Sequence, residues 1–261
     1  MFRYNFFFLL SYAPLISCFS QAIAVDVDLR KYETSFYSPN GEDGILAEIY
    51  KWIKPSSYFC VDLGAYDGFT NSMTYLLRQQ GWNGLLLDKS FDIPIFNLHK
   101  EFITAENVNM LLEKYHTPYV FDLLIVDLGY NDFYIWQAIA ELYQPTVVCI
   151  GYNSLFTPKE DKIAIYHPYF CGENNNYFGA SILALCRLGK TKGYELIYSE
   201  QTGEHLFFIR EDVLRHSNIR FIDANDLEKL YPVVSNQNKP GRSIMDPKNR
   251  KYISSCEVLK K

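Results

Sequence analysis

The sequence predicts an α/β fold in which helices cover both faces of a mostly parallel sheet. Two observations carry this prediction. Short, continuously apolar runs alternate with amphipathic helical segments, which is the pattern of parallel strands buried on both faces. The last two strand-like runs, residues 194–199 and 205–210, are separated only by a short linker around Gln201-Thr202-Gly203, so we expect an antiparallel hairpin. Parallel βα units that end in a hairpin differ from the all-parallel dinucleotide-binding fold.

The helices are expected where apolar residues recur at helical spacing. In the first helix Ile45, Leu46 and Ile49 share one face, and Pro55 stops it. Gly81 and Gly189 are expected to close two later helices. The helical segments cover residues 42–53, the region of 73–77, and residues 107–115, 135–142 and 180–188.

The strands before the hairpin are short apolar runs, several of which end at an Asp or a Gly. They cover residues 58–63, 85–87, 102–104, 121–128 and 146–150. Cys60 and Cys149 fall inside such runs and are interpreted as small core residues. The six cysteines include no CxxC pair and no Cys/His cluster with zinc spacing, so neither a disulfide framework nor a metal site is indicated.

Length and composition favour one packed domain. The chain has 261 residues, 48% of them hydrophobic and 16% aromatic, which excludes collagen, a low-complexity chain and a coiled coil. The formal net charge of −5 gives no electrostatic reason to expect nucleic acid as a partner. We place the domain at residues 41–234, between an extended arm at 25–40 and a flexible basic tail at 235–261 with seven Lys and Arg residues.

The N-terminal residues 1–24 resemble a targeting segment. Arg3 precedes an apolar run, small residues occupy positions 22 and 24, and no acid occurs before Asp26. These features are typical of a secretory signal peptide, so we expect an exported or secreted protein. Two alternatives stay open, an uncleaved membrane anchor and a lipidated Cys18 after Leu15-Ile16-Ser17. A third is a buried N-terminal segment.

Acidic residues follow successive predicted strands, where ligands of open α/β sheets bind. Gly64 and Gly68 allow a sharp turn after the first strand, but their spacing does not match the G-x-G-x-x-G of dinucleotide sites. Asp62 and Asp67 flank this turn and would repel a pyrophosphate, whereas they suit an ammonium group. Asp88 ends the next strand, where a carboxylate accepts hydrogen bonds from a ribose diol. The alternative for each acid is a helix-capping or loop residue.

Several segments together resemble the FkbM-like branch of class I S-adenosylmethionine-dependent methyltransferases. The resemblance spans roughly residues 38–212. The segments are 41–46 (GEDGIL), 61–68 (VDLGAYDG), 81–88 (GWNGLLLD), 122–127 (DLLIVD), 131–132 (ND), 152–153 (YN) and 176–181 (NYFGAS).

This resemblance implies a Rossmann-like, seven-stranded sheet whose last strand is antiparallel, and S-adenosylmethionine as the cofactor. It implies that the methionine part of the cofactor lies against Gly64, Ala65 and Gly68, that Asp88 holds the ribose, and that Glu106 or its neighbours lie near the adenine. It also places Asp127 and Asn153 near the transferred methyl group.

Four positions depart from the sequences usual in this branch. Gly129 stands where an acid is usual, Tyr130 where a glycine is usual, and Gly151 where a glutamate is usual. Lys89 follows Asp88, where a glycine is frequent. Two carboxylates that could serve as a base or as metal ligands are therefore missing. Such a pattern fits a degenerate enzyme and equally an enzyme with a changed substrate. A bulky Tyr130 is also expected to narrow the pocket.

Methyl transfer to an oxygen requires alignment and the removal or tolerance of a proton. Asp127 is the first candidate for the base and Asp132 the second. His167, Tyr152 and Tyr177 are candidates for contact with the substrate, with packing roles as the alternative. The remaining histidines, among them His205, are expected at the surface or in the hairpin.

The leading hypothesis is a methyltransferase that acts on an oxygen of a glycan or small metabolite. The alternative is an exported, non-catalytic protein that keeps the fold for binding. A nicotinamide oxidoreductase is disfavoured by the glycine spacing and by the terminal hairpin. We expect a membrane contact only through the N-terminal segment, and the sequence does not indicate the oligomeric state. S-adenosylmethionine is a cytosolic cofactor, whereas an export signal would carry the protein out of the cytosol, so these two expectations conflict.

Overall fold

The computed structural model describes residues 24–170, 173, 175–232 and 245–260. Its centre is a seven-stranded sheet of order β4-β3-β2-β5-β6-β9-β8. Every neighbouring pair is parallel except the two that β9 makes, with β6 and with β8. The strands are β2 (Phe59–Leu63), β3 (Asn83–Asp88), β4 (Leu98–Lys100), β5 (Val120–Val126), β6 (Gln144–Gly151), β8 (Tyr194–Ser199) and β9 (His205–Arg210). This is the topology of class I methyltransferases, so the predicted fold class is confirmed.

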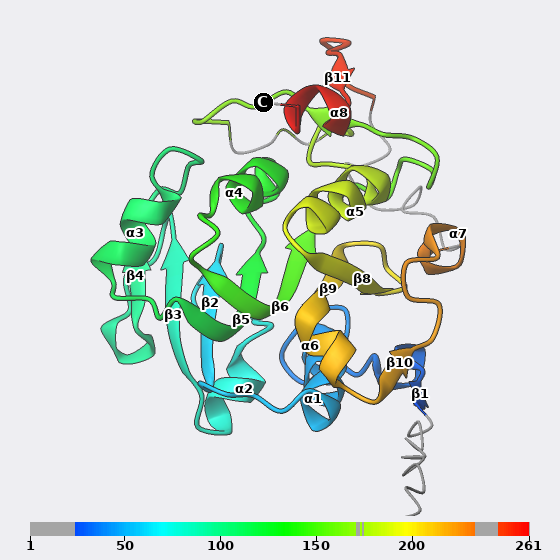
Figure 1. The fold of residues 1–261 in the computed structure, drawn as a ribbon. Helices are drawn as coiled ribbons and strands as arrows, with labels where there is room; N and C mark the ends of the chain where they lie inside the picture. Colours follow the sequence, from blue (N-terminus) through cyan, green and yellow to red (C-terminus); the bar gives the residue numbers. More distant parts are fainter. Residues whose placement is uncertain (1–23, 171–172, 174, 233–244, 261) are drawn as a thin grey trace, which may run out of the picture.

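Helices pack on both faces of the sheet (Figure 1). The helices α1 and α2 contact each other, and α4 contacts both α3 and α5. The bounds are α1 (Glu42–Trp52), α2 (Tyr75–Gln79), α3 (Val108–Lys114), α4 (Asp132–Ala138), α5 (Ile182–Thr191), α6 (Glu211–His216), α7 (Leu227–Leu230) and α8 (Ser255–Val258), with 3-10 turns η1 (Leu29–Tyr32) and η2 (Pro94–Phe96). No helix in the described part of the chain is both long and apolar enough to cross a membrane.

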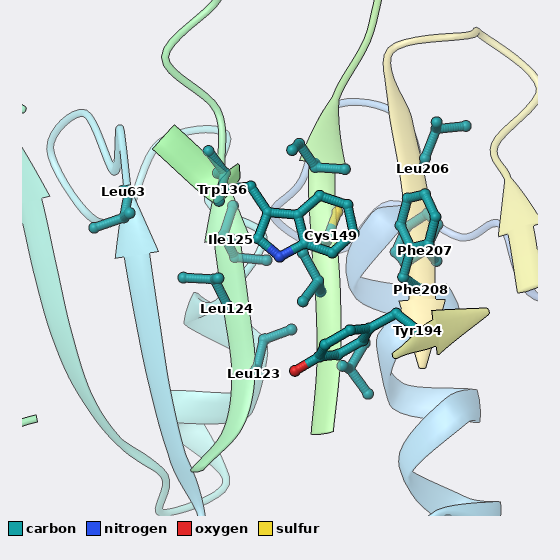
Figure 2. Close-up of a cluster of buried hydrophobic side chains, with 14 of the residues drawn as sticks. Leu63, Leu123, Leu124, Ile125, Trp136, Cys149, Tyr194, Leu206, Phe207 and Phe208 are labelled. Carbon is teal, nitrogen blue, oxygen red and sulfur yellow. The ribbon is translucent and has the colours of Figure 1, made fainter. Parts of the chain in front are cut away.

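One part of the core lies where Trp136 of α4 meets buried side chains of β5, β6, β8 and β9 (Figure 2). The Trp136 ring of α4 lies 4.9 Å from the Phe208 ring and 5.8 Å from the Tyr194 ring, measured between centroids. A Cβ atom on Gly189 would come within 2.8 Å of Phe208, so only glycine allows α5 to approach this closely. The expectation that Gly189 closes the helix is therefore wrong, because α5 continues to Thr191.

Two other element boundaries differ from expectation because asparagine side chains bind the backbone. The strand expected at 102–104 is a turn held by Asn107, which donates to the Phe102 carbonyl and accepts from the Thr104 amide. The strand at this edge of the sheet is β4, which ends at Lys100, just before the turn. The helix expected at 135–142 starts at Asp132 and ends early, where Asn109 of α3 donates to the Ala138 carbonyl and accepts from the Ala140 amide.

Both flanking segments pack against the domain. In the arm, β1 (Val25–Val27) pairs in parallel with β10 (Ile219–Phe221). In the tail, β11 (Tyr252–Ile253) pairs with β7 (Ile163–Ala164), and α8 contacts α5. Residues 245–260 of the predicted tail therefore contact the domain through β11 and α8. The rest of that tail, at 235–244 and 261, and the expected signal segment at 1–23, including Cys18, lie outside the described residues.

The turn that leads into β2 depends on one buried carboxylate. Asp122 of β5 accepts hydrogen bonds from the backbone amides of Ser56, Ser57 and Tyr58, at 2.8, 2.8 and 2.6 Å. The side chain is fully buried. It therefore connects the start of β2 to its neighbour β5.

We predict that Asp122→Ala lowers the free energy of unfolding by about 2–4 kcal/mol, because three backbone amides lose the charged acceptor that holds their turn. Urea denaturation followed by fluorescence measures the change. The exposed Asp212, replaced in the same way, is the control and is expected to cost less than about 1 kcal/mol. Equal effects of the two substitutions would contradict this role for Asp122.

Candidate functional site

Two adjoining pockets open at the carboxyl ends of β2, β3 and β5. Pocket A, of about 210 Å³, includes Asp88, Lys89, Phe102, Ile103, Asn131, Pro168 and Phe170. Pocket B, of about 310 Å³, includes Pro39, Asp62, Ala65, Thr70, Asn71, Ser72, Met73 and His205. Gly64, Tyr66 and Asp127 line both. The two pockets thus adjoin each other at these three residues.

The junction of the two pockets requires a glycine. Gly64 has φ = +101°, and a Cβ atom there would lie 2.0 Å from the backbone oxygen of Asp127. The Gly64 amide donates to the Leu87 carbonyl at 2.9 Å, and the Asp127 amide donates to the Leu63 carbonyl at 2.9 Å. These two hydrogen bonds keep the carboxyl ends of β2, β3 and β5 side by side. The acids at the ends of the predicted strands lead us to expect a site at this edge of the sheet.

Asp88 lies at the end of β3, and its carboxylate can accept more hydrogen bonds than the protein itself donates to it. One carboxylate oxygen accepts from the Tyr66 amide at 3.1 Å, and the other accepts from the Ser90 amide at 2.7 Å. An ionised carboxylate accepts about four hydrogen bonds. Two acceptor positions therefore remain for a ligand in pocket A.

Asp62 lies at the base of pocket B. Its carboxylate accepts a hydrogen bond from the Thr74 hydroxyl at 2.8 Å. Burial raises the pKa of Asp62 to about 6, although the Thr74 hydrogen bond and the Arg78 charge act in the opposite direction. A cation bound in pocket B would favour the ionised carboxylate.

The side chains of Asp127 and His205 are neighbours in the wall of the site. The Asp127 side chain at the end of β5 is 41% exposed, and its Oδ2 lies 3.4 Å from Nε2 of His205. His205 at the start of β9 is only 5% exposed, and its Nδ1 lies 2.9 Å from Oε1 of the fully buried Glu42. His205 therefore lies in the hairpin, as one of the two expectations has it, but it is buried and not at the surface. Because β9 is antiparallel, its first residue lies beside the carboxyl end of β6, and this rule could have identified His205.

Asp132 is a buried acid behind Asp127. Its Oδ1 accepts from the Leu128 amide at 2.6 Å. Burial, with the nearby charge of Asp127, raises the pKa of Asp132 to about 7. A Cβ atom on Gly151 would lie 3.4 Å from Oδ1 of Asp127 and 3.6 Å from Oδ2 of Asp132. A glutamate at position 151 would place a third carboxylate beside those of Asp127 and Asp132. Gly151 leaves this position without a side chain.

Three residues expected near the cofactor lie outside both pockets. Asp67 accepts from the amides of Phe69 and Thr70 and so shapes its own turn. Gly68 packs against β3, where a Cβ atom would meet Leu86 at 2.9 Å. Glu106 is exposed and accepts from the Tyr166 hydroxyl, while its neighbours Phe102 and Ile103 line pocket A.

The residues expected near the methyl group or the substrate are mostly engaged in structural contacts. Asn153 is fully buried and donates to the Phe178 carbonyl at 2.9 Å. The Tyr152 hydroxyl is paired with Ser199, and the Tyr177 hydroxyl donates to the Lys251 carbonyl. His167 is exposed, and its loop contributes Pro168 and Phe170 to pocket A.

Tyr130 does not line either pocket. It is buried, its hydroxyl donates to the Ile165 carbonyl at 3.0 Å, and its ring packs on Phe170 and Tyr177. Contrary to expectation, Tyr130 therefore does not narrow the pocket. The described residues also contain no group of three or more His, Cys, Asp or Glu side chains placed to hold a metal ion.

Comparison with family models gives no match, and comparison with curated proteins gives none.

We predict that Asp132→Asn stabilises the protein at pH 8 but not at pH 4.5. The folded-state pKa of about 7 lies above the unfolded value of 3.8, so ionising Asp132 opposes folding as the pH rises through this range. The expected gain in unfolding free energy is on the order of 2–4 kcal/mol at pH 8. Urea denaturation at both pH values measures it, with Asp92→Asn in an exposed loop as the control. A gain of the same size at both pH values would contradict the burial of this charge.

Proposed function

We propose that the chain is an S-adenosylmethionine-dependent methyltransferase that modifies an oxygen of a glycan or small metabolite. The observation that carries the proposal is the pair of adjoining pockets A and B at the carboxyl ends of β2, β3 and β5, in a sheet of class I methyltransferase topology. Ligands of open α/β sheets bind at such strand ends.

The residues present fit the two ends of this cofactor. In pocket A, the free acceptor positions of Asp88 suit a ribose diol, and the apolar side chains of Phe102, Ile103 and Phe170 suit a planar base. In pocket B, the carboxylate of Asp62 suits an ammonium group. The buried Nε2 of His205 lies 3.4 Å from Oδ2 of Asp127, so this wall of pocket B is polar.

When bound, S-adenosylmethionine supplies an electrophilic methyl group that needs no further activation. The chain has to align the acceptor oxygen and take its proton. Asp127 is the carboxylate for this role, because it is partly exposed at the junction of the two pockets, whereas Asp132 is buried. Pro168 and Phe170 line pocket A from the loop after β7 and would limit the access of water.

A second candidate function is non-catalytic binding by the same fold. Two observations favour it. Gly151 carries no carboxylate beside Asp127, and the polar groups of Tyr152, Asn153 and Tyr177 bind the protein itself. Methylation of a hydroxyl acceptor by the wild-type protein above the level of Asp127→Ala would exclude this function.

We predict that S-adenosylhomocysteine binds the full-length protein with micromolar affinity and that Asp88→Ala weakens this binding roughly tenfold to hundredfold. The loss corresponds to the charge-assisted hydrogen bonds of a diol. Isothermal titration calorimetry measures the affinity. Asp92→Ala, in the exposed loop after β3, is the matched control and should bind like the wild type.

Failure of the folded wild-type protein to bind at millimolar ligand would overturn the proposed cofactor. A loss in Asp92→Ala equal to that in Asp88→Ala would show instead that the loop, and not the Asp88 carboxylate, determines affinity.

A further inference from the structure

The described part of the C-terminal tail packs against the loop that follows β7. Next to the pairing of β11 with β7, two tyrosine hydroxyls connect the tail to this loop. The Tyr177 hydroxyl donates to the Lys251 carbonyl at 3.0 Å, and the Tyr252 hydroxyl donates to the Asn176 carbonyl at 2.7 Å. The same loop supplies Phe170 to the wall of pocket A. The tail is therefore bound to a segment that forms part of the candidate site.

Arg250 is the tail residue that reaches the side chain of Phe170. Its guanidinium lies over two rings, 4.2 Å from the centroid of Tyr177 and 5.3 Å from the centroid of Phe170. Two carboxylates hold the guanidinium there, since Nη2 lies 2.7 Å from Oε2 of Glu173 and 2.9 Å from Oδ1 of Asp246. Glu173 belongs to the loop and Asp246 to the tail. The Arg250 side chain is only 23% exposed, so it fills the space between the two segments.

This arrangement needs the shape of an arginine side chain. Arg250 donates from Nε to Oδ2 of Asp246 at 3.0 Å and from Nη2 to Oδ1 at 2.9 Å, which is a bidentate contact. A planar guanidinium stacks on aromatic rings while its N–H groups bind carboxylates, whereas a lysine ammonium is a point charge that cannot do both in the same way. We therefore expect lysine at position 250 to replace the charge but not the contact with the rings.

The Phe170 ring depends on contacts from two sides. On the side of the domain, its centroid lies 4.2 Å from the centroid of the buried Tyr130 ring. The tail contributes Arg250. The backbone of the same segment makes a tight turn, in which the Phe170 amide donates to the His167 carbonyl at 3.1 Å, and the next residue back, Tyr169, is 77% exposed. The position of the Phe170 ring is thus determined by Tyr130 and Arg250 together.

We infer that Arg250 is a positioning residue for the ligand of pocket A, because it holds the Phe170 ring in the wall of that pocket from the C-terminal tail. Arg250 itself lines neither pocket, so its effect on a ligand passes through Phe170. The inference rests on the proposed function for the identity of the ligand, a planar base that carries a ribose.

The test is a double-mutant cycle between Arg250→Ala and Phe170→Ala in the full-length protein. Calorimetry measures the affinity for methylthioadenosine, which carries the base and the ribose. Lys248→Ala is the matched control, because Lys248 pairs with the same Glu173 from the same tail, at 2.5 Å, and its removal leaves the ring contacts of Arg250 in place. Arg250→Lys is the conservative variant, and thermal unfolding checks that each protein is folded.

Arg250→Ala should weaken methylthioadenosine about fivefold to tenfold, and Phe170→Ala should weaken it at least as much, as expected for a lost aromatic contact. The double variant should lie within about twofold of Phe170→Ala, because residues that act through one contact are not additive. Arg250→Lys should recover only part of the loss, and Lys248→Ala should stay within about twofold of the wild type.

A second measurement needs no ligand. Hydrogen exchange of the peptide that contains the Phe170 amide should be faster in Arg250→Ala than in the wild type, and unchanged in Lys248→Ala, because the turn at Phe170 opens more easily without the guanidinium.

Additive losses in the cycle would overturn the inference, since Arg250 would then act through the fold and not through Phe170. Wild-type affinity in Arg250→Ala would also overturn it, as would unchanged exchange at Phe170. Absence of wild-type binding to both methylthioadenosine and S-adenosylhomocysteine would overturn the proposed function instead, and the exchange rates would still decide whether Arg250 holds Phe170.

Discussion

The approach of Gly64 to the backbone oxygen of Asp127 is the constraint on which the site depends. No side chain fits between the loop after β2 and the end of β5, since a Cβ atom would lie 2.0 Å from that oxygen. The same two residues line both pockets. The parallel pairing of β2 with β3 and β5 then places Asp62, Asp88 and Asp127 around one opening. A break in this contact would separate the two halves of the site and loosen the centre of the sheet.

Several buried, charged side chains surround the contact between Gly64 and Asp127, and stability alone does not favour their burial. Glu42, Asp132 and His205 are buried, and they come from the start of α1, the start of α4 and the start of β9. Buried ion pairs contribute little to stability compared with apolar packing of the same volume. Groups with strongly shifted pKa values are concentrated at functional sites. We therefore interpret the network as a feature of the binding site, supported by the apolar core around Trp136.

The sequence predicts the fold well because the fold follows from the order of apolar runs, and the hairpin of β8 and β9 has the predicted bounds. Strand ends also predict which acids line the pockets, as Asp62, Asp88 and Asp127 do. Side-chain partners distant in sequence are not predictable in this way. Asn153 satisfies the loop at residues 176–178, and His205 pairs with Glu42 from 163 positions earlier in the chain. Such contacts depend on how the loops fold back, which periodicity does not encode.

The most direct test of the account is a crystal structure of the protein grown with saturating S-adenosylhomocysteine. The account predicts one ligand that spans pockets A and B, with its ribose hydroxyls at Asp88 and its amino-acid group in pocket B near Asp62. A ligand bound elsewhere, or pockets that hold only solvent at saturating concentration, would contradict the claim that this strand-end site is a cofactor site.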